Sequence, residues 1–453
     1  MIGLSEMGRY RIYPPECDII GGHALRRYPA RVTRARLHRF SDFLRIETVV
    51  PHRFQTLDGY RAIAVLAVVT THVAYFSGIV VVTAWGHLFS RMDIGVTIFF
   101  LLSGFLLFRP WSLAAMKDGR WPGTRTYFRR RLWRILPAYL VLVVVVLAVM
   151  PGIEVHPKHW FAHLTLTQIY WPKLLINGLT QSWSLATELS FYLVLPAIAW
   201  WVGRRRRGDI DASTRRQLWI LGGCAVVAFL WLLLRTTTGV REFGVVNMWL
   251  PNFMDWFAVG MAFAVVHNRL RLPDPPAWML RLNRLADDTA IWLVIAVALF
   301  LLASTPVAGP YTFGEGSAAQ AFMRHYLYLG AAGCLLVPGF LGTQGWGAWR
   351  AFLASPLMSY LGKISYGVFL WHLFVLETGS RLIGIDSFTG WFWILWPMTV
   401  LGTVLLAHIS FVVIERPAQE YSHSQRRLFR RGPQPPTQPP EQSPAQPPAA
   451  TRA

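Results

Sequence analysis

Long blocks of hydrophobic residues alternate with short polar segments along this chain of 453 residues. A helix that crosses a bilayer needs about 20 predominantly apolar residues, and most of the blocks reach or approach that length. The pattern therefore predicts an all-α fold, a polytopic integral membrane bundle of about ten transmembrane helices. The expected spans are residues 61–83, 94–109, 135–151, 182–202, 217–234, 247–266, 289–307, 321–341, 357–378 and 391–413.

Basic residues are concentrated in every second polar segment. Arginine clusters precede the first expected span and follow the second, fourth, sixth and tenth. Cytoplasmic loops of membrane proteins are enriched in Lys and Arg, so both termini are expected in the cytoplasm. This topology explains the formal net charge of +21, and we expect no nucleic-acid partner.

Composition agrees with a membrane protein and suggests three parts. Hydrophobic residues make up 54% of the chain and charged residues 15%. Residues 1–54 are expected to form a basic cytoplasmic N-terminal extension without a signal-peptide core, so the first span would direct insertion. Residues 55–418 would form the transmembrane domain. Residues 419–453 would be a cytoplasmic tail, first basic and then proline-rich and disordered.

Other sequence features add smaller expectations. The three cysteines, Cys17, Cys224 and Cys334, show neither a disulfide framework nor metal-ligand spacing, and we expect no bound metal. The segment 152–181 is rich in aromatic residues and histidine. We expect it to lie at the membrane surface and partly cover the outer mouth of the bundle.

The first expected span contains two ionisable residues on one face. Arg61 and His72 lie eleven residues apart in LDGYRAIAVLAVVTTH, almost a whole number of helical turns and about 16 Å along the axis. An imidazole deep in a membrane helix usually faces a cavity or a proton relay, so His72 is a candidate functional residue. The alternative is a structural hydrogen bond to a neighbouring helix.

Two further ionisable residues are expected at the depth of His72. Glu188 lies in the fourth span and His372 in the ninth. Such a cluster suggests an enclosed polar cavity in which the carboxylate orients or balances a histidine base. His372 could also serve only a structural hydrogen bond. Asp255, in the sixth span, is another intramembrane acid, and the sequence does not indicate its partner.

A second group of residues is expected at the cytoplasmic side. Arg131 and Arg134 are three residues apart and share a helical face, and Arg109 follows FFLLSGFLLFRP. Paired guanidinium groups suit a phosphate or pyrophosphate, although arginines near a membrane often only determine topology or contact anionic lipids. Ser103 and Gly104 are small residues expected to allow close helix packing.

Six motifs, in order, resemble the membrane-bound acyltransferase 3 family of bacteria over about residues 55–418. They are LDGYRAIAVLAVVTTH, FFLLSGFLLFRP, RRRLWRILPAY, SWSLATELSFYLVLP, SYGVFLWH and the closing ERP. The resemblance implies an inner-membrane enzyme that transfers an acyl group to a hydroxyl of an envelope carbohydrate or glycolipid. The donor would be acyl-coenzyme A, typically acetyl-coenzyme A.

The resemblance also implies roles for particular residues. His72 would be the general base, with Arg61 and Glu188 completing the catalytic group. Donor binding would fall to Arg131, Arg134 and Arg109, and acceptor binding to His372, Ser365, Tyr366 and Trp183. Many family members carry an extracytoplasmic hydrolase-like domain, so a separate extracytoplasmic partner protein could supply that module here.

Two other function classes are compatible with the same residues. A proton-coupled transporter or flippase could use intramembrane His and Glu as a relay and arginines to hold an anionic headgroup. The sequence shows no repeated halves, which disfavours this class. A non-catalytic sensor that binds acyl-coenzyme A is the other alternative.

Overall fold

The computed structural model describes residues 55–428, except 84, 118–120, 151–154, 205–208, 239–244, 312–315 and 343–346. The chain divides after Arg53, and every described residue belongs to the part that follows. The described residues form helices and connecting turns, with no strand among them. The expected N-terminal extension and the proline-rich part of the tail lie outside the described residues.

The elements follow one another as a series of long helices with short helical connections. They are α2 (Gln55–Ser77), α3 (Ile79–Val82), α4 (Gly86–Ser90), η1 (Arg91–Asp93), α5 (Ile94–Met116), α6 (Thr124–Val149), α7 (Pro157–Leu164), η2 (Gln168–Tyr170), α8 (Ser182–Gly203), α9 (Ile210–Thr237), η4 (Val246–Met248), η5 (Leu250–Phe253), α10 (Met254–Arg269), α11 (Ala277–Leu285), α12 (Thr289–Ala303), η6 (Pro306–Ala308), α13 (Ala318–Phe340), α14 (Ala348–Leu353), α15 (Pro356–Leu382), α16 (Phe392–Ser410), the π-helical η7 (Phe411–Glu415) and α17 (Arg416–Leu428).

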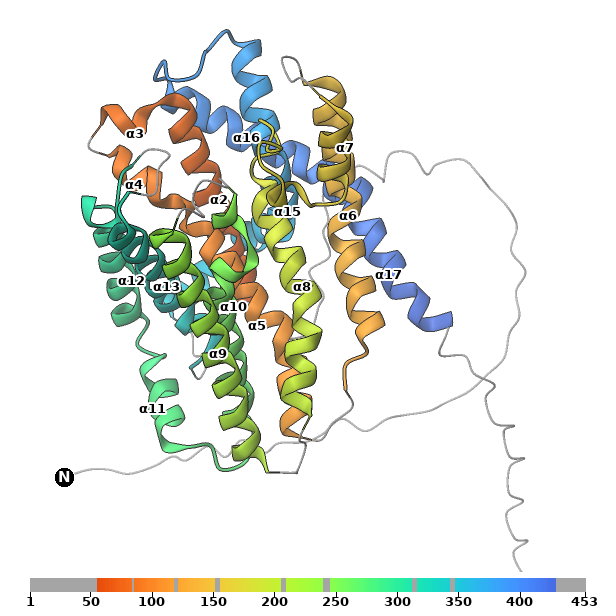
Figure 1. Ribbon diagram of the computed structural model, residues 1–453, viewed down its shortest axis with the longest axis vertical. Helices are drawn as coiled ribbons and strands as arrows, with labels where there is room; N and C mark the ends of the chain where they lie inside the picture. Colours follow the sequence, from red (N-terminus) through yellow and green to blue (C-terminus); the bar gives the residue numbers. More distant parts are fainter. Residues whose placement is uncertain are drawn as a thin grey trace, which may run out of the picture. The chain divides into compact units, whose positions relative to one another are not determined.

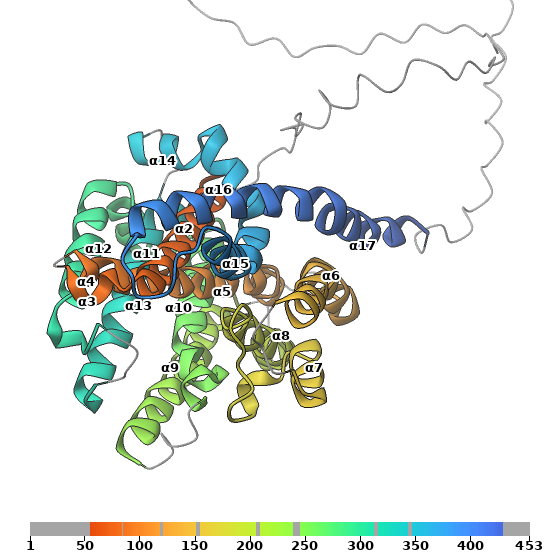
Figure 2. The same cartoon turned by 90° about the horizontal axis from the view of Figure 1, so that it is seen from above.

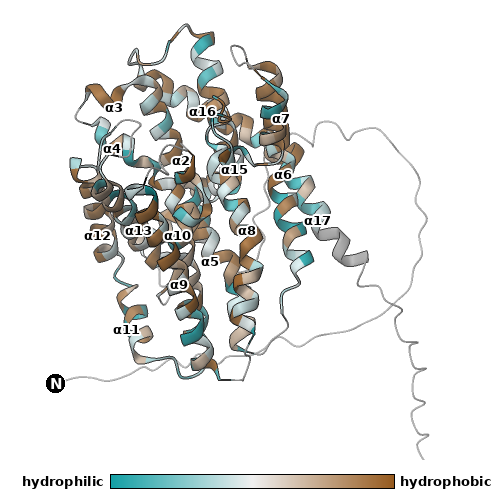
Figure 3. Ribbon diagram, viewed as in Figure 1, coloured by the Kyte–Doolittle hydropathy of each residue, from teal (hydrophilic) through white to brown (hydrophobic). Residues whose placement is uncertain are grey.

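The all-α polytopic prediction is confirmed. Each of the ten expected spans coincides chiefly with a different helix: α2, α5, α6, α8, α9, α10, α12, α13, α15 and α16. By length and hydropathy, six helical segments of the described chain could each cross a membrane, and the pair α11 and α12, bent by 79°, could form a seventh. The number of ten crossings therefore stays a prediction. Figure 3 shows α12 as largely hydrophobic, whereas the lower ends of α6 and α9 carry hydrophilic residues.

Helices α2, α5, α10 and α15 pack in the middle of the bundle (Figures 1 and 2). From above, α12 and α13 lie on one side of this group and α6, α7 and α8 on another. Glycines allow α5 and α10 to approach closely. A Cβ atom on Gly104 would lie 2.3 Å from the carbonyl oxygen of Phe257, and one on Gly260 would lie 2.1 Å from that of Leu101. The packing role predicted for Gly104 is confirmed.

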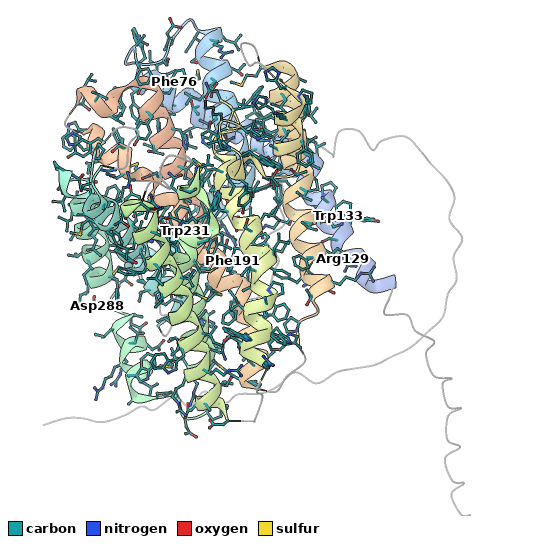
Figure 4. All side chains as sticks on the ribbon, viewed as in Figure 1. Phe76, Arg129, Trp133, Phe191, Trp231 and Asp288 are labelled. Atoms are coloured by element: carbon teal, nitrogen blue, oxygen red, sulfur yellow. The ribbon has the colours of Figure 1, made fainter. Side chains whose placement is uncertain are left out.

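Stacked aromatic rings extend this interface to α8. The ring of Phe257 on α10 lies 4.5 Å from the Phe100 ring on α5 and 4.0 Å from the Phe191 ring on α8. Figure 4 shows Phe191 in the interior of the bundle. Buried aromatic pairs of this kind each contribute about 0.5–1.5 kcal/mol beyond the area they bury. They hold α8 at a fixed position beside α5.

Hydrogen bonds connect the segment between α6 and α8 to neighbouring helices. The Tyr139 hydroxyl on α6 donates a hydrogen bond to the His163 carbonyl oxygen at 2.7 Å, and Nε2 of the fully buried His163 donates to the Leu174 carbonyl oxygen at 2.9 Å. The backbone N–H of Gly178 donates to Glu377 of α15 at 2.9 Å. These contacts order the segment against α6 and α15.

Candidate functional site

A cavity of about 800 Å³, its open mouth included, lies between α2, α5, α6, α8 and α15. Its polar lining consists of Arg61, Ser103, Arg131, Arg134, Ser184, Glu188, Tyr192, Ser365 and Tyr366. Its apolar lining consists of Val96, Phe99, Phe100, Leu102, Leu106, Leu107, Ile135, Leu185 and Phe369. Six of the ten residues that the sequence assigned to the site therefore meet at this cavity.

Three guanidinium groups make the polar wall of the cavity cationic. Arg61 comes from the start of α2, and Arg131 and Arg134 come from successive turns of one α6 face. Asp58 pairs with Arg61 at 2.7 Å, while the buried Nε of Arg131 has no hydrogen-bond partner among the described residues. Glu188 is the carboxylate in the same lining, so cationic groups outnumber it. This wall favours an anionic ligand.

Glu188 is held by two hydroxyl groups. Oε1 accepts a short hydrogen bond from Ser103 of α5 and another, 2.8 Å long, from Tyr192 one turn further along α8. The sequence assigned Ser103 to packing and did not single out Tyr192. The spacing of four residues between Glu188 and Tyr192, which places both on one helical face, could have indicated this contact. The Ser103 contact joins different helices and has no local sequence signal.

His72 and His372 form a pair. Their ring centroids are 4.9 Å apart in an edge-to-face arrangement. Nδ1 of His72 lies 2.8 Å from the Val68 carbonyl oxygen, and Nδ1 of His372 lies 2.8 Å from that of Phe369. A carbonyl oxygen only accepts hydrogen bonds, so Nδ1 carries the hydrogen in both rings and each Nε2 keeps its lone pair. Either Nε2 can therefore accept a proton.

The two histidines differ in their surroundings. His372 is fully buried, and its Nε2 has no hydrogen-bond partner among the described residues. His72 is partly exposed. A base that exchanges protons with a substrate must be reachable, so His72 suits that role better, with His372 beside it.

An aromatic pair lies between the cavity and the histidines. Phe99 and Phe369 both line the cavity, and their ring centroids are 6.4 Å apart. The Phe369 ring is also 6.1 Å from the His372 ring, less than one helical turn along α15. Neither histidine lines the cavity itself, and the Phe369–His372 contact connects the cavity wall to the histidine pair.

The remaining expected site residues lie elsewhere. Arg109 does not line the cavity; its carbonyl oxygen accepts a hydrogen bond from Asn268 of α10 at 2.9 Å. Trp183 also lies outside the lining, with its ring centroid 5.5 Å from that of Phe253. Sequence spacing identified the helices that carry these residues correctly but did not fix the direction of their side chains.

Glu188 is also separate from the histidine pair in its hydrogen bonding. In the described part of the chain, no hydrogen bond or ion pair joins Glu188 to His72 or His372; the glutamate bonds to Ser103 and Tyr192 instead. Similar expected depth did not imply a hydrogen bond, because contact between residues of different helices also depends on how each helix is rotated.

The partner of Asp255 is His325 of α13. Nε2 of His325 lies 2.8 Å from Oδ2 of Asp255, and both side chains are buried. The imidazole stacks on Trp256 with ring centroids 4.8 Å apart. Because the pair joins residues 70 positions apart, the sequence alone gave no indication of it.

The family follows from a comparison with known proteins. Residues 54–415 match the family model described as an acyltransferase domain, in the acyltransferase 3 group. The chain belongs to this family. The match covers the whole cavity and the histidine pair, and it makes the protein an acyltransferase. No solved structure matches the chain.

Relatives support the same class. Acyltransferase MdmB of Streptomyces mycarofaciens is 29% identical over 360 residues, which cover 73% of this chain and 81% of that protein. Peptidoglycan O-acetyltransferase OatA of Listeria monocytogenes is 25% identical over 391 residues, covering 81% of this chain and 56% of that protein. Nodulation protein 10 of Rhizobium leguminosarum bv. viciae is 25% identical over 354 residues, covering 72% and 82%. Together with the apolar helices, these findings indicate a multi-pass membrane O-acyltransferase.

Proposed function

We propose that this protein transfers an acyl group, typically acetyl, from acyl-coenzyme A to a hydroxyl of an envelope carbohydrate or glycolipid at the bacterial inner membrane. One observation carries the proposal: a cavity with three arginines in its wall is also lined by Phe369, whose ring lies 6.1 Å from that of His372 in the histidine pair. An anionic donor in the cavity would thus lie beside a general base.

The arginines would bind the phosphate groups of the donor. Planar guanidinium groups form paired hydrogen bonds with phosphate oxygens, and each such charge-assisted bond contributes about 1.5–3 kcal/mol. Arg61, Arg131 and Arg134 face the same space from two helices. The uncharged arm of coenzyme A suits the apolar lining that leads toward Phe369. The thioester would then lie near His72, about 16 Å along α2 from Arg61.

The chemistry requires a proton to move twice. Nε2 of His72 takes the proton of the acceptor hydroxyl as its oxygen attacks the thioester carbonyl carbon. The carbon–sulfur bond breaks, and the coenzyme A thiolate takes the proton back from the imidazolium. The Nδ1–H bond to Val68 holds the ring in the tautomer that this step needs.

The acceptor class rests on the relatives. One of them is by name a peptidoglycan O-acetyltransferase. An acceptor with sugar hydroxyls on the extracytoplasmic side would approach the partly exposed His72 from the end opposite the arginines. His372 and Trp183 remain proposed acceptor-side residues. Ser365 and Tyr366 were also expected to bind the acceptor, but they line the cavity that this proposal gives to the donor; Arg109 is a proposed donor-side residue outside that lining.

The test uses purified full-length protein in lipid nanodiscs with acetyl-coenzyme A labelled with ¹⁴C in the acetyl group. Envelope extract from cells that lack the gene supplies acceptors. We expect a labelled product whose label is released by mild alkali, as an ester requires. Protein that binds acetyl-coenzyme A but produces no ester would overturn the proposal and favour a sensor. Movement of unmodified cargo without ester would favour a transporter.

A pair of histidine variants tests the base. His72→Gln should lower ester formation by at least 100-fold and leave coenzyme A binding unchanged, because general base catalysis contributes about 10²–10⁴-fold. His156→Gln, at an exposed position outside the cavity lining, is the matched control and should behave as wild type. Equal activity in the two variants would exclude His72 as the base.

A further inference from the structure

The proposed function leaves a charge to be balanced. When His72 takes the hydroxyl proton it becomes an imidazolium in an interior site, where an unpaired charge is costly. Glu188 was the expected counter-charge. Its Oε1 is engaged by Ser103 and Tyr192 instead, with no hydrogen bond or ion pair to His72 in the described chain.

A different carboxylate, that of Asp93, belongs to a turn that packs on α2, the helix of His72. The Thr71 hydroxyl, next to His72 on α2, donates a 3.2 Å hydrogen bond to the carbonyl oxygen of Ser90. Ser90 leads directly into the 3₁₀ turn η1, which packs on α2 and ends at Asp93. The carboxylate of Asp93 lies close enough for its charge to interact with that of His72.

The Asp93 side chain does not cap the helix that follows it. Asp93 is the N-cap residue of α5, where an aspartate usually accepts hydrogen bonds from the first backbone N–H groups of the helix. It makes no such bond. Instead Oδ1 accepts a short hydrogen bond from the buried Tyr328 hydroxyl on α13. The carboxylate is thus fixed from a second helix.

Several other charged and titratable groups surround His72 and Asp93. They are His372 on α15, Tyr75 on α2, Arg91 on η1, and Arg324 and Tyr328 on α13. Arg91 is 1% exposed, and its guanidinium donates to backbone carbonyl oxygens, including Ala303 at 3.0 Å and Gly309 at 2.7 Å. Those carbonyl groups offset part of the Arg91 charge. Asp93 interacts with the charges of Arg324 and Arg91 as well as with that of His72.

We propose that Asp93, held by Tyr328, is the positioning residue that stabilises protonated His72 during acyl transfer. Asp93 acts through its charge and does not touch the reacting atoms. This inference rests on the proposed role of His72 as the base. It assigns to Asp93 the function that the sequence assigned to Glu188, and it leaves Glu188 a separate role in the cavity.

The test measures the protonation of His72 directly and needs no substrate. Full-length protein with ¹³C-labelled histidine is titrated in nanodiscs by NMR, and the His72 signal is assigned by its loss in His72→Gln. In Asp93→Asn we expect the midpoint of the His72 titration to move to lower pH by about one unit, which is tenfold in proton affinity. Tyr328→Phe keeps the charge but loosens the carboxylate and should move the midpoint in the same direction by less.

Two matched variants each remove the charge of a carboxylate elsewhere in the bundle. Glu188→Gln and Asp255→Asn should leave the His72 midpoint unchanged, because Glu188 bonds within the cavity and Asp255 pairs with His325. The inference is overturned if the His72 midpoint does not move in Asp93→Asn. If that variant does not fold, an unmoved midpoint in Tyr328→Phe overturns it. So does an equal shift in Glu188→Gln. Since no transfer is measured, these failures are distinct from the failure of ester formation that would overturn the proposed function.

Discussion

Arg131 and Arg134 line the same cavity from successive turns of α6, together with Arg61 of α2. Their arrangement suits the proposed phosphate site, to which each guanidinium would contribute a charge-assisted hydrogen bond. A residue that only determined topology would not need to face the cavity.

Replacing Arg131 by alanine should weaken coenzyme A binding about 10–100-fold, as expected for loss of one charge-assisted bond of about 1.5–3 kcal/mol. Isothermal calorimetry on the nanodisc-embedded protein would measure this. Arg129→Ala is the matched control, because Arg129 carries the same charge on the same helix but does not line the cavity (Figure 4). Equal losses in both variants would indicate general electrostatic attraction instead of a site.

Glu188 accepts hydrogen bonds from Ser103 and Tyr192 on one oxygen. Each hydroxyl can therefore partly compensate for loss of the other. Ser103→Ala or Tyr192→Phe alone leaves the carboxylate with one donor. The double variant leaves it with neither, and a poorly solvated carboxylate is costly. We expect the double variant to lose more activity than the product of the single losses, with a coupling of about 0.5–3 kcal/mol. Independent effects in this double-mutant cycle would show that the donors do not share Glu188.

The α5–α10 contact depends on glycines that no larger residue can replace without backbone movement. A Cβ atom at either Gly104 or Gly260 would overlap a backbone carbonyl of the facing helix. Gly104→Ala and Gly260→Ala should each lower the free energy of unfolding by about 1–3 kcal/mol. Thermal unfolding in detergent measures the effect. Gly222→Ala on α9, where no atom lies within 4 Å of the added Cβ, should be neutral or stabilising.

The segment that connects α6 and α8 contains a histidine suited to a pH test. Burial lowers the pKa of His163 from 6.5 to about 4. The unfolded segment therefore binds the proton more readily, and stability is lost as pH falls from about 6.5 to about 4, by up to about 3 kcal/mol. Hydrogen exchange of residues 157–181 should accelerate over that range. His163→Asn should remove this pH dependence; an unchanged profile would show that another group is responsible.

Several contacts between helices could not be predicted from the sequence pattern. Hydrophobic blocks located the helices, and residue spacing gave the shared faces of Arg131 with Arg134 and of Arg61 with His72, because these are properties of one helix. Pairs such as Ser103 with Glu188, Asp255 with His325 and Asp93 with Tyr328 join separate helices. Such pairs depend on helix rotation and tilt, which packing decides. For the same reason similar depth alone could not decide which residues Glu188 contacts.

Across the whole molecule, alternating basic segments predict both termini in the cytoplasm and ten crossings. The shortest helix among these crossings is α12, with 15 residues. The next shortest is α10, whose 16 residues span about 24 Å against a hydrocarbon thickness of about 30 Å. The short helices η4 and η5 precede it directly and add length. The Asp255–His325 pair lies at this end of α10, where the bundle interior shields it.

Cysteine accessibility tests this topology in the loops on either side of α9 and α10 and in the segment between α6 and α8. In a variant without native cysteines, single cysteines replace Lys158, Thr238, Arg204 or Arg281, which are all exposed. An impermeant maleimide added to intact cells should label the first two positions, and should label the last two only after the membrane is permeabilised. Labelling of the Arg281 position from outside would make α10 a re-entrant helix. The expected number of crossings would then fall. Labelling of the Arg204 position from outside as well would show that the cationic cavity does not open to the cytoplasm.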